Sequence, residues 1–279
     1  MLITAFLGRE GMAYFKTSSG CNLYYELIGQ GPGKPVVTCL NGTLQTTVNW
    51  KAMVKQLSHQ FGFLIYDSRG QGASDLGDQP LSLDLHVTDI QGLLEELKIR
   101  QTHLVGLSHG ARVALALVDR SPELVLRMVL CSISTRAGFR ARMIVRSWLE
   151  ILQRHSLDAM VWAAVPHVFG RNYLHQNEKM LDRIVKTIVR RNKTEALRAH
   201  LEALAGYPAL SGVLKRLPCL SLVIRGEDDP LVSAQGVEEV ARICGSRQTT
   251  LPGVGHSIMA EAPQQLAELV GNFFSTDGH

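Results

Sequence analysis

The sequence predicts an α/β protein built on a mostly parallel sheet of eight strands, with helices on both faces and an inserted all-helical segment. Two observations carry this prediction. Apolar runs of strand length alternate with amphipathic stretches of helical length through both ends of the chain, as in strand–helix–strand units. From about residue 135 to residue 208 this alternation stops, and apolar residues recur at helical spacing only.

Short apolar runs define the predicted strands. They lie at residues 12–17, 23–28, 35–40, 61–66, 102–107, 126–131, 220–225 and 248–251. The first two resemble an opening hairpin, and the later runs are of the length expected of buried strands. Helical periodicity marks residues 49–57 and 83–97 between them, and residues 143–152, 180–189 and 196–204 in the helical segment.

The break in the pattern divides the chain into two parts. We expect residues 1–134 and 209–279 to form one core domain, and residues 135–208 to form a helical cap over the carboxyl ends of the strands, where open α/β sheets bind ligands. Between residues 136 and 200 the cap has 13 lysines and arginines against 5 acidic residues, about +8, so the rest of the chain is about −4 of the total +4. This excess indicates either a solvated helical face or attraction of an anionic substrate or acidic carrier protein.

Length and composition exclude several classes of protein. With 279 residues, 46% hydrophobic and 19% charged, the chain can bury a full core. No apolar stretch approaches the roughly 20 residues that cross a bilayer, so no membrane span is predicted. Residues 1–8 are apolar but lack the basic start of a signal peptide, and Met12 is an alternative initiator. No feature predicts nucleic-acid binding, and the oligomeric state is not predicted.

The cysteines and histidines favour neither disulfides nor a metal. The five cysteines are an odd number, and Cys39, Cys131 and Cys219 lie in apolar runs, which indicates buried thiols in a reducing, cytoplasmic compartment. No cysteine or histidine cluster has the spacing of a metal site, so neither a metal nor an organic cofactor is expected.

The pentapeptide Gly106-Leu107-Ser108-His109-Gly110 carries the predicted chemistry. It joins a predicted strand to a helical run, which is the context of a G-x-S-x-G nucleophile elbow, where a serine sits on a sharp turn. Ser108 could instead be an ordinary helix cap. A nucleophilic serine needs a base and a group that orients the base, and two later turns supply candidates: the turn with Asp228 and Asp229, and the turn with His256.

These segments together resemble the α/β-hydrolase superfamily over nearly the whole chain except the cap. In that family the order is serine, acid, histidine, and the acid follows a glycine as G-x-x-D, which selects Asp229 over Asp228. The family histidine follows a glycine, as His256 follows Gly255. The resemblance implies a triad of Ser108, Asp229 and His256, with an eight-stranded α/β-hydrolase sheet beneath it.

The resemblance also implies an oxyanion hole made of two backbone N–H groups, from His109 and Thr43. The loop of Thr43 has Asn41 where most relatives have histidine, and Asn41 is expected to hold the turn through its own side chain. A further family segment, Asp67 to Ser74, is interpreted as scaffold, with Asp67 and Arg69 paired inside the loop.

The leading functional hypothesis is a serine hydrolase that cleaves a carboxylic ester, lactone or thioester through an acyl-enzyme on Ser108. An alternative is an acyltransferase that uses an acyl-carrier or coenzyme A thioester, because residues 41–47 resemble the N-G-x-x-x-T-T stretch of such enzymes. Carbon–carbon bond hydrolases share the triad, and some members of the fold are ligand receptors. Four aromatic cap residues are candidates for the lining of an acyl pocket or for cap core: Trp148, Trp162, Phe169 and Tyr173.

Overall fold

A computed structural model describes residues 12–275 and contains the predicted sheet of eight strands, in the order β1-β2-β4-β3-β5-β6-β7-β8. The strands are β1 (Met12–Lys16), β2 (Asn22–Ile28), β3 (Val36–Leu40), β4 (Gly62–Tyr66), β5 (Thr102–Leu107), β6 (Val125–Cys131), β7 (Ser221–Gly226) and β8 (Arg247–Leu251). β1 pairs with β2 and β2 with β4 in antiparallel fashion, and every pair from β3 to β8 is parallel. The predicted mostly parallel sheet of eight strands is therefore confirmed.

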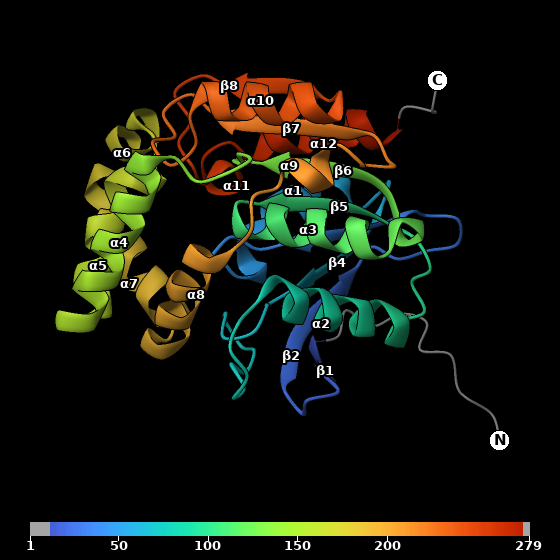
Figure 1. The fold of residues 1–279 in the computed structure, drawn as a ribbon, viewed down its shortest axis with the longest axis horizontal. Helices are drawn as coiled ribbons and strands as arrows, with labels where there is room; N and C mark the ends of the chain where they lie inside the picture. Colours follow the sequence, from blue (N-terminus) through green and yellow to red (C-terminus); the bar gives the residue numbers. More distant parts are fainter. Residues whose placement is uncertain (1–11, 276–279) are drawn as a thin grey trace.

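Helices cover both faces of the sheet (Figure 1). Around the sheet lie α1 (Lys51–Leu57), α2 (Leu83–Glu96), α3 (His109–Arg120), α9 (Ser211–Leu214), α10 (Ala234–Cys244), α11 (Ile258–Glu261) and α12 (Pro263–Ser275). Between β6 and β7 lie α4 (Phe139–Arg154), α5 (Leu157–Val168), α6 (Arg171–Gln176), α7 (Leu181–Arg191) and α8 (Thr194–Gly206). Short 3-10 helices span Thr47–Trp50, Pro122–Leu124 and Glu178–Met180.

Alternating side chains of the strands feed two separate cores, as the period of two in a strand requires. In β4, Leu64 and Tyr66 pack with α2, α3 and α10 on one face, whereas Phe63 and Ile65 pack with α1 and α12 on the other. All five residues of β4 are buried. In a parallel sheet covered on both faces in this way, ligands bind at the carboxyl ends of the strands.

The helices α4, α5, α6, α7 and α8, here called the helical insertion, gather beside one end of the sheet (Figure 1). They have a hydrophobic cluster of their own, which includes Trp148 of α4, Met160 of α5, Val185 of α7 and Leu201 of α8. Apolar spacing predicted parts of α4, α7 and α8. It did not define α5, which is apolar on most sides and contains Pro166.

One expectation about the loop after β4 is wrong. Arg69 does not pair with Asp67 but forms a buried, two-bond ion pair with Asp89 of α2, with Nε to Oδ2 at 2.6 Å and Nη2 to Oδ1 at 2.8 Å. Asp67 instead accepts backbone N–H bonds from Thr47 and Ala73, at 2.7 Å and 3.0 Å. Because these N–H groups hydrogen-bond the Asp67 carboxylate, it does not need a cation as partner. The Arg69 guanidinium is therefore available to pair with Asp89.

Along residues 12–275, none of the helices combines the length and the apolar character that crossing a membrane requires. The alternative start at Met12 concerns residues 1–11, which lie outside the described residues.

Candidate active site

Ser108 sits on a strained turn between β5 and α3. Its φ is +53° and its ψ −110°, a conformation that costs a non-glycine residue on the order of 1–3 kcal/mol. The backbone N–H of Ser108 donates to the carbonyl of Cys131 at 2.9 Å, which fixes the turn to the end of β6. Such strain lifts the serine side chain away from the sheet, as a nucleophile elbow requires.

The two glycines of the pentapeptide are required by close backbone contacts. A Cβ on Gly106 would lie 2.7 Å from the backbone of Gly110 and Ala111, and a Cβ on Gly110 would lie 2.0 Å from the carbonyl oxygen of Leu40. These are far inside van der Waals contact, so α3 can approach β3 and β5 only because both positions lack a side chain.

Asp229 and His256 meet at the ends of the neighbouring strands β7 and β8. His256 Nδ1 and Asp229 Oδ2 are 2.8 Å apart, and both residues are buried. The other oxygen of Asp229 accepts the backbone N–H groups of Leu231 and Val232, at 2.8 Å and 3.1 Å. With the carboxylate held on both oxygens, the bond to Nδ1 leaves Nε2 as the imidazole atom available for a substrate or a nucleophile.

Ser108 and His256 line two adjoining pockets, here called the first and second lobes of one cavity. The first lobe has a volume of about 350 Å³ and the second about 580 Å³. Ser108 Oγ forms no hydrogen bond within residues 12–275. Catalytic hydrogen bonds are often made only once substrate is bound, so a shared cavity wall is the relevant relation here.

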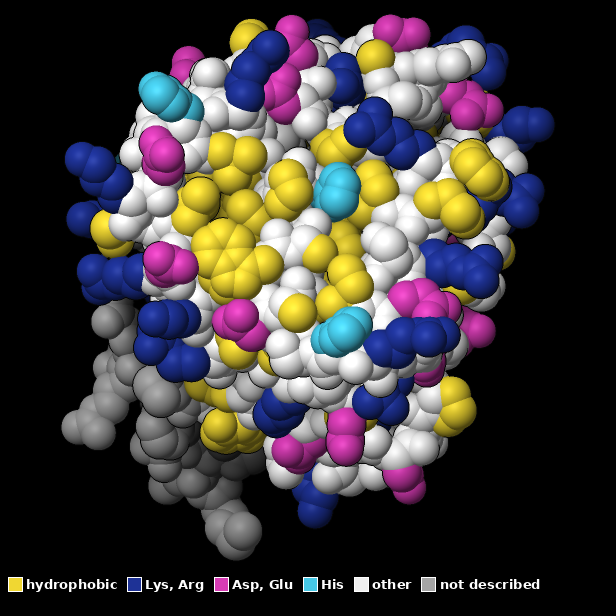
Figure 2. Space-filling model, turned by 90° about the vertical axis from the view of Figure 1, so that its left-hand side faces the viewer, with side chains coloured by type: hydrophobic (Ala, Val, Ile, Leu, Met, Phe, Trp, Pro, Cys, Tyr) yellow, Lys and Arg dark blue, Asp and Glu magenta, His cyan; other side chains and the backbone are white. Residues whose placement is uncertain are grey.

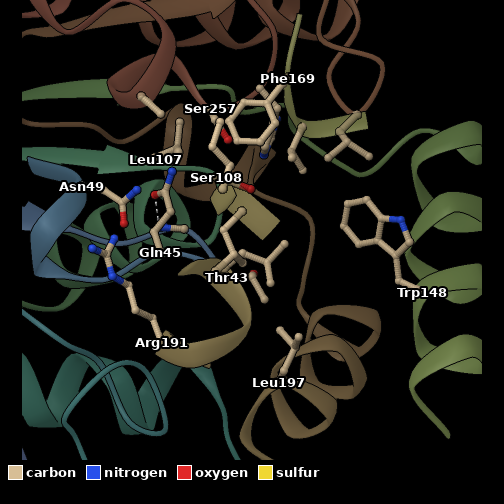
Figure 3. Close-up of a pocket in the computed structure, with 18 of the residues that line it drawn as sticks. Thr43, Gln45, Asn49, Leu107, Ser108, Trp148, Phe169, Arg191, Leu197 and Ser257 are labelled. Atoms are coloured by element: carbon tan, nitrogen blue, oxygen red, sulfur yellow. Dashed lines mark hydrogen bonds between the residues drawn. The ribbon is translucent and has the colours of Figure 1, made fainter. Parts of the chain in front are cut away.

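The first lobe, shown in Figure 3, is mainly apolar. Its lining includes Leu44, Leu107, Trp148, Met160, Val168, Phe169, Tyr173, Ile184 and Leu197. Three of the four predicted aromatic candidates therefore face the cavity. The fourth, Trp162, is 39% exposed and lines neither lobe.

Thr43 and His109, the predicted oxyanion donors, come from the loop after β3 and from the start of α3. Thr43 lines the first lobe, and His109 is the first residue of α3, whose N–H has no partner inside the helix. Within the described chain neither backbone N–H donates a hydrogen bond. Two free donors beside a serine can stabilise a developing oxyanion.

Side chains that the sequence did not single out brace the Thr43 loop. Gln71 Nε2 donates to the carbonyl of Gly42 at 2.7 Å, and Gln45 Oε1 accepts the N–H of Gly42 at 2.9 Å. Asn41 bonds the Tyr66 carbonyl at 2.9 Å and the indole of Trp50 at 2.7 Å. Asn41 thus holds the turn as expected, and both glutamines hold the backbone beyond it.

A buried group of three histidines is the one potential cation site among the described residues. Ring nitrogens of His86, His109 and His200 lie within 4.8 Å of one another. The rings of His86 and His200 stack with an interplanar angle of 16°, so their in-plane lone pairs do not converge on one point. Burial lowers the pKa of all three, that of His109 to about 3, and the His109 ring bonds Tyr207 at 3.1 Å. The arrangement favours neutral packing over metal binding.

The family assignment comes from comparison with known sequences. The profile of the alpha/beta hydrolase family matches residues 39–269. The chain belongs to this family. The matched range runs from β3 to α12, so it includes Ser108, Asp229, His256 and the helical insertion.

Curated relatives of this alpha/beta hydrolase cover most of its length. It is 25% identical to a putative 2-succinyl-6-hydroxy-2,4-cyclohexadiene-1-carboxylate synthase of Bacillus subtilis, over 90% of this chain and 95% of that protein. It is 27% identical to the 2-hydroxymuconate semialdehyde hydrolase of a Pseudomonas species, over 88% and 84%. Among solved structures, MGS-M2, an alpha/beta hydrolase from a deep-sea metagenome library, matches with a TM-score of 0.89 at 23% identity, over 96% and 98%. The match to MGS-M2 shows similarity of fold alone.

Proposed function

We propose that this chain is a serine hydrolase that cleaves a carboxylic ester, lactone or thioester. The observation that carries the proposal is the placement of a strained Ser108 in the wall of the cavity that also exposes His256, whose other ring nitrogen is held by Asp229. A serine is a weak nucleophile on its own and needs such a base and orienting acid.

In the proposed reaction Ser108 Oγ attacks the acyl carbon while His256 Nε2 takes the hydroxyl proton. The carbonyl oxygen gains negative charge, which the N–H groups of Thr43 and His109 stabilise. His256 returns the proton to the leaving alcohol or thiol, and the acyl group stays on Ser108 as an ester. Water then attacks that ester with His256 again as base, releasing the acid and restoring the serine.

We further propose that residues 135–208 act as a cap over this site, with residues 1–134 and 209–279 as the core domain. Helices α4, α5, α7 and α8 all contribute side chains to the cavity, whereas the predicted catalytic residues come from the sheet. A cap of this kind excludes water and shapes the pocket for the acyl and leaving groups. The expected cytoplasmic location stays a prediction; all five cysteines are free.

The acyltransferase alternative depends on the resemblance in residues 41–47, and the contacts there have a local use. Asn41 bonds Tyr66 and Trp50, Thr46 begins the 3-10 helix, and the Thr47 N–H bonds Asp67. None of the three lines either lobe. The shared residues therefore support the loop of the oxyanion hole, and they do not by themselves favour transfer over hydrolysis.

The decisive experiment is fluorophosphonate labelling combined with hydrolysis of short p-nitrophenyl esters. We expect Ser108→Ala to abolish both, while Ser147→Ala, an exposed serine of α4 outside both lobes, leaves them unchanged. Turnover that survives Ser108→Ala would refute the proposal, and ligand binding without any turnover would favour the receptor alternative. Acyl transfer from an acyl-carrier thioester that competes with water would favour the transferase.

A further inference from the structure

More arginines line the second lobe than the first, which has Arg183 and Arg191. Four arginines line the second lobe, namely Arg112, Arg136, Arg142 and Arg146, together with two acidic residues, Glu150 and Glu202. Glu150 is already paired with Arg154 at 3.0 Å. Among the described residues none of the four arginines forms a salt bridge with a carboxylate.

Arg112 is the arginine closest to the chemistry along the chain, one helical turn after Ser108 on α3. It is half-buried, and its guanidinium makes two long bonds to backbone carbonyls, to Pro208 at 3.4 Å and to Ser134 at 3.5 Å. A guanidinium has five N–H donors, so most of its capacity is unused. Burying a cation without a counter-charge is unfavourable, which makes this position costly unless an anion joins it.

Arg142 and Arg146 line the same lobe from α4. They are one turn apart on α4 and therefore lie on the same side of that helix. Arg142 is steadied by a bond to the Ala137 carbonyl at 2.7 Å and by the ring of Phe139, 5.7 Å away. Arginine N–H groups from two helices of one cavity can bind the planar oxygen pair of a carboxylate or the oxygens of a phosphate.

The outer face of the insertion does not show a comparable concentration of charge (Figure 2). On the face that carries the insertion, lysines and arginines are spread around an apolar centre and are interspersed with acidic side chains (Figure 2). Exposed apolar residues of the insertion include Phe139, Met143, Trp162 and Met180. This face suits a large acidic protein poorly, whereas a small anion fits inside the second lobe.

We infer that the second lobe is a subsite for a carboxylate or phosphate group carried by one half of the substrate, while the first lobe receives the other half. The inference rests on the proposed function, because both halves must meet at Ser108. It names the substrate class as an amphiphilic ester or thioester with one anionic half.

The test uses butyrate esters that differ only in the leaving phenol: neutral 4-hydroxybenzamide, 4-hydroxybenzoate and 4-hydroxyphenyl phosphate. A second pair, the p-nitrophenyl esters of glutaric acid and of glutaramic acid, places the charge in the acyl half. We expect at least one charged ester to exceed its neutral partner about tenfold in kcat/KM, and the preferred ester distinguishes carboxylate from phosphate.

Arg112→Gln, Arg142→Gln and Arg146→Gln should each lower the charged-to-neutral ratio about fivefold. Arg140→Gln removes the same charge from an exposed position of α4 outside both lobes and should leave the ratio within twofold. If Arg112→Gln does not fold, the exposed positions Arg142 and Arg146 decide the question.

Two results overturn the inference while the proposed function stands: no charge preference in either series, or a preference that is lost in Arg191→Gln of the first lobe but kept in the second-lobe variants. If the wild type hydrolyses no ester, the proposed function falls. Binding of 4-hydroxybenzoate and 4-hydroxyphenyl phosphate to wild type and to Arg142→Gln, measured by calorimetry, then tests the anion subsite. Binding that Arg142→Gln weakens supports it, and no binding or equal binding overturns it.

Discussion

Glu261 holds the loop of His256 from both sides. Its carboxylate accepts the backbone N–H of Gly255 at 2.9 Å and that of Ser257 at 3.2 Å, the residues directly before and after the histidine. The same carboxylate accepts the N–H of Gly170 at 2.8 Å, at the start of α6 in the helical insertion. One side chain thereby fixes the proposed base and ties the insertion to it.

Replacing Glu261 with glutamine should lower kcat by about tenfold with a smaller effect on KM. The amide has one acceptor oxygen in place of two, and its NH₂ would face N–H donors, leaving buried groups unpaired at about 1–3 kcal/mol. Ester kinetics and urea unfolding measure the two effects. Glu268→Gln, exposed on α12, is the matched control, and a Glu261→Gln variant indistinguishable from it would show that Glu261 does not position His256.

The positions of Ser108, Asp229 and His256 could be predicted because each follows a strand, and the carboxyl ends of parallel strands meet at one edge. The bracing by Glu261 and Gln71 could not. Their partners are backbone N–H and carbonyl groups of loops distant in sequence. The residue types in a sequence do not indicate such partners, because every residue has a backbone. The expected pairing of Asp67 with Arg69 was wrong for the same reason, because Asp67 bonds backbone N–H groups instead.

The lining of the cavity was predictable only in part. Trp148 lies on α4, where polar and apolar positions alternate at helical spacing and define an inner face. Trp162 lies on α5, which is apolar on most sides, so its sequence does not show which face turns inward. The four arginines of the second lobe come from α3, from α4 and from the segment before α4, and only the fold brings them together.

Asparagine at position 229 should lower kcat by about 10⁴, the loss known for this change in the acid of a serine triad. The neutral amide can no longer stabilise the imidazolium and favours the wrong tautomer of His256. The neighbouring Asp228 provides the control, because its carboxylate bonds the side chain and N–H of Arg171 at 3.0 Å each. Asp228→Asn should stay within about threefold of wild type; a larger loss there than in Asp229→Asn would reverse the assignment of the acid.

Alanine at position 110 should prevent stable folding or remove several kcal/mol from the free energy of unfolding. Its Cβ would collide with the Leu40 carbonyl at 2.0 Å, and neither backbone can yield without disturbing the sheet. Gly138→Ala is the comparison, since a Cβ there meets nothing within 4 Å and its φ is −61°. Urea unfolding of both variants measures the difference, and equal stability would mean that the elbow is looser than its geometry implies.

Phenylalanine at position 103 should stabilise the protein increasingly as the pH falls. The His103 ring is buried, stacks on Phe274 with centroids 4.3 Å apart, and leaves its Nδ1 without a partner among the described residues. Burial, with a smaller contribution from the charge of Arg127, lowers the pKa of His103 to about 4. On acidification, the His103 ring therefore takes up a proton near pH 6.5 in the unfolded chain. In the folded protein it does so only near pH 4.

The contribution of the neutral His103 ring to the free energy of unfolding is fully present above pH 6.5. It is lost as the pH falls, at up to roughly 1.4 kcal/mol per pH unit. His103→Phe removes this loss, so its advantage over wild type in urea should be small at pH 8 and grow between pH 6.5 and about 4. His155→Gln, an exposed histidine at the end of α4, should follow the wild-type pH dependence. An advantage of His103→Phe that does not change with pH would show that the ring is not held neutral by burial.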